Sequence, residues 1–193
     1  MPVEDQHRWD AKYADRESAP VRPSLLLTGL DHLLPKSGHA IDVAGGAGRH
    51  AIWLAQRGLD VTLTDISPVG LDIARERAAA AGVELTTQHV DLEADPFPLG
   101  PNPSGKWDLI VSFQFLWRPL FTEFAKALAP GGLLVFSQPT VRNLEKHAKP
   151  PARFLLEEGE LRQLASDLEI VHYEEDWLAE GRHDALLVAR GAL

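Results

Sequence analysis

Three aspartates, Asp42, Asp65 and Asp91, each stand at the end of a short strand-like run of the sequence. These runs, at 40–43, 61–64 and 85–90, follow one another along the chain and are separated by helix-like segments. Ligands of open α/β sheets bind at the carboxyl ends of the strands, so three carboxylates at such ends predict a polar crevice. One ligand that spans the crevice would explain all three.

A glycine turn follows the first of these runs. In "IDVAGGAGRHA", Gly46, Gly48 and Ala51 fit the dinucleotide fingerprint G-x-G-x-x-A. Such a turn lets the backbone approach a ligand, and it directs the first amides of a helix toward that ligand. Asp65 lies about 20 positions beyond Gly45, where an acid accepts hydrogen bonds from ribose hydroxyls. The pattern therefore predicts an adenosine-containing ligand.

Asp42, just before the glycines, indicates which ligand this is. A carboxylate at that position would repel a pyrophosphate, whereas it would attract an α-ammonium group. S-adenosylmethionine carries an ammonium and a sulfonium but no phosphate, so Asp42 favours it over a nicotinamide dinucleotide. The alternative role for Asp42 is a capping residue bonded to loop amides. Asp91 can reach the exocyclic amine of an adenine, with Leu92 packed on the ring.

The composition narrows the class of protein. The 193 residues are 45% hydrophobic, which suits one folded domain. A formal charge of -9 argues against broad contact with nucleic-acid phosphates. The chain has no Cys and its eight His show no paired ligand spacing, so we expect no disulfide and no metal site. No apolar run suits a membrane helix and the start lacks signal-peptide features, so we expect a cytoplasmic location.

Apolar runs alternate with helix-like segments through most of the chain. Runs at 40–43, 61–64, 85–90, 109–113 and 133–137 are typical of a parallel sheet covered on both faces. Helices are predicted from Arg49 toward Gly58, from Ser67-Pro68 to Gly82, from Pro119 to 129–132, and over 157–167. Two final runs, 169–173 and 185–189, predict an antiparallel hairpin.

These elements predict a single α/β domain over 1–193. It contains a doubly wound, mostly parallel seven-stranded sheet with helices on both faces and a C-terminal antiparallel hairpin. Residues 1–37 are expected to form a helical lid, with helical periodicity at Leu25, Leu26, Leu30, Leu33 and Leu34. Residues 38–140 form the expected cofactor-binding core. Residues 141–193 form the expected substrate-side segment and hairpin.

Five quoted segments carry a family resemblance. "IDVAGGAGRHA", "TDIS", "VDLE", "WDLIVSFQFL" and "LAPGGLLVFSQP" resemble the successive motifs of the class I S-adenosylmethionine-dependent methyltransferases. Ala44 replaces the first glycine of that family's D-x-G-x-G-x-G loop. Two C-terminal segments, "RFLLEEGELRQLASDLEIVHYEEDW" and "GRHDALLVAR", are similar to those of the tellurite-resistance-type small-molecule methyltransferases. "HRWDAKYADRE" resembles the lid helix of such enzymes.

The resemblance implies an enzyme that moves a methyl group from S-adenosylmethionine to a small-molecule acceptor by in-line displacement, leaving S-adenosylhomocysteine. By the same resemblance, Trp9 and Tyr13 close over the cofactor, although they would also suit ordinary helix anchors at i and i+4. The remaining residues expected at the cofactor are Asp42, Ala44, Gly45, Gly46, Gly48, Asp65, Ile66, Asp91, Leu92, Ser112 and Phe113.

The acceptor side has weaker signals. Gln114, Arg182 and His183 are candidates for acting on a substrate, with an exposed turn as the alternative for the last two. Segment 112–116 lacks the acidic or Asn residue followed by Pro-Pro and an aromatic that adenine amino methylases carry, which argues against a DNA adenine methylase. Phe113, Phe115 and Trp117 can form a wall of the substrate pocket. Basic residues gather at Arg142, Lys146, His147, Lys149 and Arg153.

That basic segment is either a solvated loop or a positive mouth for an anionic small molecule. Two other functions remain open. Gly46, Gly48, Ala51 and Asp65 also suit an NAD(P)-dependent Rossmann oxidoreductase, although the chain shows no convincing Tyr-x-x-x-Lys pair. A non-catalytic S-adenosylmethionine-binding protein would share the same motifs. The sequence leaves the acceptor atom, the need for a general base and the oligomeric state open.

Overall fold

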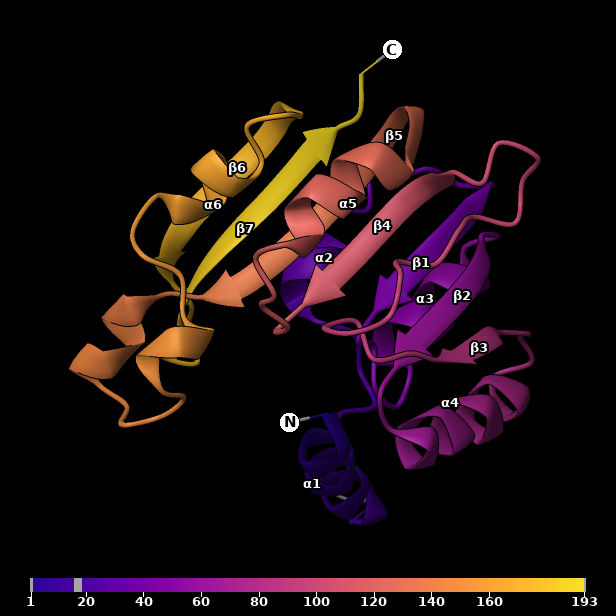
Figure 1. Ribbon diagram of the computed structural model, residues 1–193, viewed down its shortest axis with the longest axis horizontal. Coiled ribbons are helices and arrows are strands. Elements are labelled where there is room, and N and C mark those ends of the chain that lie inside the picture. Colours follow the sequence, from indigo (N-terminus) through magenta and orange to yellow (C-terminus); the bar gives the residue numbers. More distant parts are fainter. Residues whose placement is uncertain (1, 16–18, 193) are drawn as a thin grey trace.

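The computed structural model describes residues 2–15 and 19–192 (Figure 1). Met1, Leu193 and residues 16–18 lie outside this range, and with them parts of the expected lid at 1–37 and of "HRWDAKYADRE". The described residues form one seven-stranded sheet in the order β3-β2-β1-β4-β5-β7-β6. The sheet and its helices confirm the predicted α/β class.

The strands are parallel except for the C-terminal pair. Neighbours among β1 to β5 run parallel, whereas β7 lies antiparallel between β5 and β6. Their bounds are β1 His39–Val43, β2 Asp60–Asp65, β3 Thr86–His89, β4 Trp107–Phe113, β5 Leu128–Pro139, β6 Glu169–Trp177 and β7 His183–Arg190. Strand order reverses between β1 and β4, which creates a crevice at their carboxyl ends.

Helices cover both faces of the sheet. Buried leucines from α2 (Leu25–Gly29), α3 (Arg49–Gln56) and α4 (Pro68–Ala80) pack on one face. Phe121, Phe124 and Leu161, from α5 (Leu120–Ala127) and α6 (Glu160–Leu164), pack on the other. Helix α1 (Pro2–Ala14) lies instead against α4, at the end of the sheet where β1 and β2 end (Figure 1).

Two short 3-10 helices follow β5 and complete the fold. They are η1 (Val141–Glu145) and η2 (Ala152–Phe154), and they lie near the carboxyl end of β5 (Figure 1). The crevice is thus bordered by α1 on the side of the first strands and by the 3-10 segment on the side of β5.

Within the two described ranges, every helix is too short or too polar to cross a bilayer.

Local signals set several helix ends. Ser67 begins α4 as predicted, because its Oγ accepts the N–H of Gly70 at 3.1 Å and Pro68 follows at the first helical position. Other predicted bounds differ. Helix α2 has five residues and leaves Leu25 86% exposed, so the leucine periodicity was too weak to define a long helix. Helix α6 is also shorter than 157–167, and residues 129–132 belong to β5.

Candidate functional site

A cavity of about 530 Å³ opens at the carboxyl ends of the parallel strands. This volume is in the range of small-molecule and cofactor sites. Its walls come from α1, the ends of β1 to β5, the η2 segment and the β6–β7 turn. The site therefore joins the first and last parts of the chain across the strand ends.

The glycine turn after β1 is shaped by close contacts. Gly46 has φ 58°, and a Cβ added there would collide with the hydroxyl of Tyr13 from α1. Gly48 has φ 79° and packs so closely on α4 that an added Cβ would lie 2.9 Å from the Ala74 Cβ. Ala44, in the position of the family's first glycine, also has a positive φ, 53°. The turn thus needs small residues for both backbone conformation and packing.

Asp42 has the capping role that the sequence offered as an alternative to ligand binding. Its Oδ2 accepts the Ala51 N–H at 3.0 Å, which satisfies an amide in the first turn of α3. Its Oδ1 is buried and has no partner among the described residues. Burial raises the pKa of the Asp42 carboxyl to about 7, against the lowering effect of the Ala51 N–H and of the nearby Arg49. Asp42 lines the cavity, and its unpartnered Oδ1 remains able to accept a hydrogen bond.

Asp65, at the end of β2, holds the glycine turn to the next loop. Its Oδ2 accepts the Gly46 N–H at 2.8 Å and its Oδ1 accepts the Ser67 N–H at 2.9 Å. Burial raises the pKa of this carboxyl, while the two N–H bonds act in the opposite direction. Because each carboxylate oxygen has two acceptor sites, both can still receive a ligand hydroxyl.

Asp91 completes the row of strand-end carboxylates. Its Oδ1 accepts the Glu93 N–H at 3.1 Å, and its Oδ2 is buried without a partner among the described residues. Ile66 and Leu92 line the same part of the cavity and supply apolar surface. Asp42, Asp65 and Asp91 thus lie around one space, as the sequence predicted.

Helix α1 covers this end of the cavity. Trp9 and Tyr13 both line it, and their rings stack with centroids 5.8 Å apart. Tyr13 also contacts Gly70 at the start of α4. Burial, with the charges of Asp65 and Asp42, raises the pKa of the Tyr13 hydroxyl, so it stays protonated and able to donate. A cover over the cofactor and a helix anchor are therefore compatible roles for this pair.

Most residues expected at the cofactor line the cavity. Those that do are Trp9, Tyr13, Asp42, Ala44, Gly45, Asp65, Ile66, Asp91, Leu92 and Phe113. Gly46 lies under Tyr13, Gly48 packs on Ala74, and Ser112 is fully buried. These three shape the site from behind its surface.

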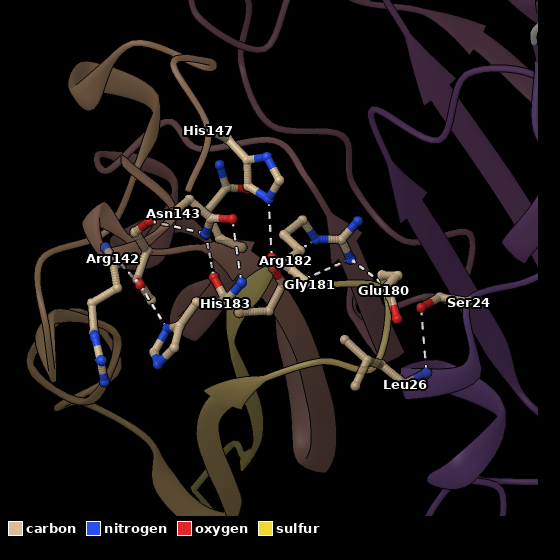
Figure 2. Close-up of polar contacts among 12 residues, drawn as sticks. Ser24, Leu26, Arg142, Asn143, His147, Glu180, Gly181, Arg182 and His183 are labelled. Atoms are coloured by element: carbon tan, nitrogen blue, oxygen red, sulfur yellow. Dashed lines mark hydrogen bonds and ion pairs between the residues drawn. The ribbon is translucent and has the colours of Figure 1, made fainter. Parts of the chain in front are cut away.

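The three candidate substrate residues have different surroundings. Gln114 and Arg182 line the cavity, and His183 is absent from its described lining. An exposed turn was considered for His183, but this residue starts β7 and is only 2% exposed. The Asn143 side chain hydrogen-bonds the backbone of His183, and His183 Nδ1 lies 2.8 Å from Thr140 Oγ1 (Figure 2). Phe113 and Phe115 form walls as expected, whereas Trp117 is absent from the described lining.

The basic segment does not supply a positive mouth among the described lining residues. Lys146 Nζ lies 3.5 Å from the Trp177 ring centroid. His147 Nε2 lies 3.0 Å from the Gly181 carbonyl oxygen (Figure 2). Pro150 and Phe154 of this segment line the cavity in place of its charged side chains. The segment therefore contributes apolar surface to the site.

Sequence reasoning missed several polar lining residues, among them Arg49, His50 and Gln138. His50 is 3% exposed and its ring centroid lies 4.6 Å from that of Phe113. Burial lowers the pKa of His50 to about 3, so its imidazole is neutral. Gln138 ends the apolar run of β5 much as Asp42 ends that of β1, and this position was the available signal. Within the described ranges, no cluster of three or more His, Asp or Glu could hold a metal ion.

Comparison with known proteins identifies the fold and the motifs. Residues 40–132 match the family described as "Methyltransferase domain". TehB from Haemophilus influenzae superposes with a TM-score of 0.71 at 19% identity, over 95% of this chain and 67% of that one. In the motifs of residues 40–132 and in fold, the chain is similar to the class I S-adenosylmethionine-dependent methyltransferases. The unpartnered buried oxygens of Asp42 and Asp91 fit the family's cofactor, because its ammonium and adenine amine are donors.

Two curated relatives match parts of this sequence. The demethylmenaquinone methyltransferase of Thermus thermophilus is 37% identical over 49% of this chain and 44% of its own length. The tRNA 5-carboxymethoxyuridine methyltransferase of Escherichia coli is 31% identical over 59% of this chain and 46% of its own. The chain thus spans less than half the length of these relatives.

Proposed function

We propose that this protein transfers the methyl group of S-adenosylmethionine to a small-molecule acceptor. The observation that carries the proposal is the pair of buried, unpartnered carboxylate oxygens on Asp42 and Asp91, on either side of Asp65 in one cavity. A buried acceptor without a donor costs stability, so such atoms are retained where a ligand supplies the donor. A ligand with amines at both ends and ribose hydroxyls between them meets this demand.

Each lining residue then has a defined part in holding the cofactor. Asp42 Oδ1 accepts the α-ammonium group, Asp65 accepts the ribose hydroxyls, and Asp91 Oδ2 accepts the adenine amine. Ile66 and Leu92 pack on the base, and Trp9 and Tyr13 cover the site from α1. When bound, the cofactor would supply a sulfonium-activated methyl group, which the nucleophilic atom of the methyl acceptor could displace in line.

The protein's own contribution to the reaction is alignment and the exclusion of water. Phe113 and Phe115 place aromatic surface where the strand ends meet the acceptor side, and such surface can stabilise a sulfonium. Neutral His50 has a pKa far below that of an effective base at neutral pH, so it serves as a hydrogen-bonding group. The remaining lining of the cavity determines which acceptor enters.

A small acceptor is favoured over a nucleic acid. One relative is named for demethylmenaquinone and one for a tRNA nucleoside, so relatives alone leave both classes open. The net charge of -9 opposes binding to polyanions, and Pro150 and Phe154, rather than the basic side chains around them, line the cavity. Both observations support an acceptor that fits inside the cavity.

The cofactor part of the proposal is tested by thermal unfolding with S-adenosylhomocysteine, NAD and NADP. We expect the melting temperature to rise with S-adenosylhomocysteine alone, and less in Asp42→Asn than in Asp72→Asn, a matched change on the surface of α4. A rise with NAD or NADP alone would support a nicotinamide oxidoreductase and overturn the proposal.

The transfer itself is tested with methyl-labelled S-adenosylmethionine and a panel of small phenols, thiols, amines and oxyanions, with bulk tRNA as the macromolecular comparison. We expect label on at least one small acceptor, and a loss of product in Asp42→Asn. Tight binding of S-adenosylhomocysteine without any labelled product would favour a non-catalytic binding protein. Label on tRNA alone would contradict the small-molecule acceptor.

A further inference from the structure

Gln138 is a buried polar side chain in the cavity wall, away from the row of aspartates. It lies near the end of β5, is 3% exposed, and lines the cavity. Its Nε2 donates to the Phe154 carbonyl at 2.6 Å, and its Oε1 has no partner among the described residues. The side chain is therefore held at one end, and at the other it presents an acceptor without a donor.

The anchor fixes the orientation of the amide. A backbone carbonyl only accepts hydrogen bonds, so the Gln138 atom that contacts Phe154 must be the nitrogen. The oxygen is then the atom left unpartnered, and it can only accept. A buried carbonyl without a donor destabilises the folded state, and a ligand with an O–H or N–H group would offset this cost.

The charge of Arg182, which lines the same cavity as Gln138, is already balanced. Arg182 donates from Nε and Nη2 to the two carboxylate oxygens of Asp184 at 2.6 and 2.7 Å, and Asp184 is 3% exposed. Asp184 pairs in register with Pro139, the residue after Gln138. Because the guanidinium is occupied by this bidentate pair, it offers little attraction to an anionic ligand.

Several other residues of the cavity wall are uncharged, whereas Arg49 also lines the cavity and has Asp42 as the main charge acting on it. Phe154, Pro150 and Pro139 provide apolar surface from the segment after β5 and from its end. His50 also lines the cavity, is 3% exposed, and has a buried Nε2 without a partner among the described residues. A neutral imidazole offers one donor and one acceptor, so these residues add apolar surface and neutral polar atoms to the cavity wall.

We infer that the methyl acceptor is an uncharged, largely apolar molecule whose O–H or N–H group donates a hydrogen bond to Gln138 Oε1. This inference rests on the proposed function and specifies the class of substrate that the same cavity takes. Gln138 acts as a specificity-determining residue, since the hydrogen bond selects a protic group and places it against the apolar wall. Replacing the proton of that group with a methyl removes the donor and leaves Oε1 unsatisfied.

The test measures binding to the protein saturated with S-adenosylhomocysteine, so it does not depend on turnover. The probes are matched pairs, naphthol with methoxynaphthalene and indole with its N-methyl derivative, with naphthoate as the anionic probe. Dissociation constants come from ligand-observed NMR titrations. We expect each protic probe to bind roughly tenfold tighter than its methylated partner, and tighter than naphthoate.

Gln138→Met keeps the length of the side chain and removes the hydrogen-bond acceptor atom Oε1. We expect the preference for protic probes to fall to near unity in this variant, with unchanged affinity for S-adenosylhomocysteine. Gln163→Met, an exposed change in α6, is the matched control and keeps the preference. If Gln138→Met fails to fold, the comparison of probe pairs on the unmodified protein still decides the inference.

The possible failures are distinguishable. Failure of S-adenosylhomocysteine to bind the unmodified protein overturns the proposed function. Binding of S-adenosylhomocysteine with equal affinity for the members of each pair, with tighter binding of naphthoate, or with no detectable binding of any probe overturns the inference and leaves the proposed function standing. An unchanged preference for protic probes in folded Gln138→Met also overturns the inference, because another group would then accept the hydrogen bond from the probe.

Discussion

The two ends of the cavity are built in different ways. The cofactor end draws Asp42, Asp65 and Asp91 from the ends of three successive strands, and each binds a backbone amide within a few residues of a strand end or glycine turn. The acceptor end draws Gln138, Phe154 and Arg182 from β5, η2 and the β6–β7 turn, which meet through tertiary contacts. Local sequence thus determines one end, and the packing of the C-terminal segments determines the other.

The two ends also differ in charge. At the cofactor end, carboxylate oxygens are left without partners in a buried setting, so the site demands donors and favours a cation. At the acceptor end, the cation Arg182 is matched by Asp184, the charge of Arg49 faces Asp42, and unpartnered atoms belong to neutral Gln138 and His50. We therefore expect ionic recognition of the cofactor, and recognition of the acceptor by shape and a hydrogen bond.

The largest effect separates the two ends by mutation. Asp42→Asn removes the charge that pairs with the α-ammonium group and keeps an oxygen for the Ala51 N–H, so affinity for S-adenosylhomocysteine should fall roughly 10- to 100-fold. Gln138→Met should leave that affinity unchanged. Isothermal titration calorimetry measures both, with Asp72→Asn as the surface control. Equal losses in the two variants would show that the ends are not independent.

The second effect is the pH dependence of the cofactor end. The pKa of Asp42 is raised to about 7, so the carboxyl becomes neutral below that pH and loses its attraction for an ammonium. Affinity for S-adenosylhomocysteine should then fall by up to roughly tenfold per pH unit below 7 and be level above it. Calorimetric titrations on both sides of pH 7 measure this, and Asp42→Asn should flatten the profile.

The same raised pKa has the opposite consequence for the ligand-free protein. The folded state holds the Asp42 proton up to about pH 7, whereas the unfolded chain releases it near the ordinary aspartate pKa of 3.8. The free energy of unfolding should therefore decrease as pH rises through this window, and Asp42→Asn should remove that part of the decrease. A pH-independent affinity with a charged Asp42 throughout would contradict both expectations.

The contrast between the ends explains what the sequence could predict. Buried parallel strands read as apolar runs, and the cap at Ser67 and the aspartates at strand ends are local signals, so the sheet and the cofactor end were predictable. Gln138 ends an apolar run just as Asp42 does, but its role depends on a carbonyl of the η2 segment, which carries no strand-end or glycine-turn motif. His183 reads as a turn residue, and only its contacts with Asn143 and Thr140 explain its burial.

A smaller effect concerns the contact between α1 and the glycine turn. Gly46→Ala introduces strain at φ 58° and a collision with the Tyr13 hydroxyl, so it should weaken S-adenosylhomocysteine binding and destabilise the protein. Gly82→Ala is the matched control, because Gly82 has φ 72° and an added Cβ would meet nothing within 4 Å. It should lose only the strain, about 1 kcal/mol.

Removing the Tyr13 ring should recover part of that loss. The destabilisation by Gly46→Ala should be smaller in a Tyr13→Ala background, with a coupling of about 0.5–3 kcal/mol in a double-mutant cycle. Urea unfolding of the four proteins measures the coupling. Strict additivity would mean that α1 is not seated on the turn as described.

The smallest effect tests strain that both ends share. Ala44 after β1 and Gln114 after β4 have φ of 53° and 62°, a conformation that costs a non-glycine residue about 1–2 kcal/mol. Glycine removes this strain but adds freedom to the unfolded chain, so Ala44→Gly and Gln114→Gly should each stabilise by about 0.5–1 kcal/mol in urea unfolding. The two changes should differ in function: Ala44→Gly removes a single methyl group from the cavity lining, whereas Gln114→Gly removes a polar side chain. Destabilisation by either change would show that the turn at that strand end is held by side-chain contacts that outweigh its backbone strain.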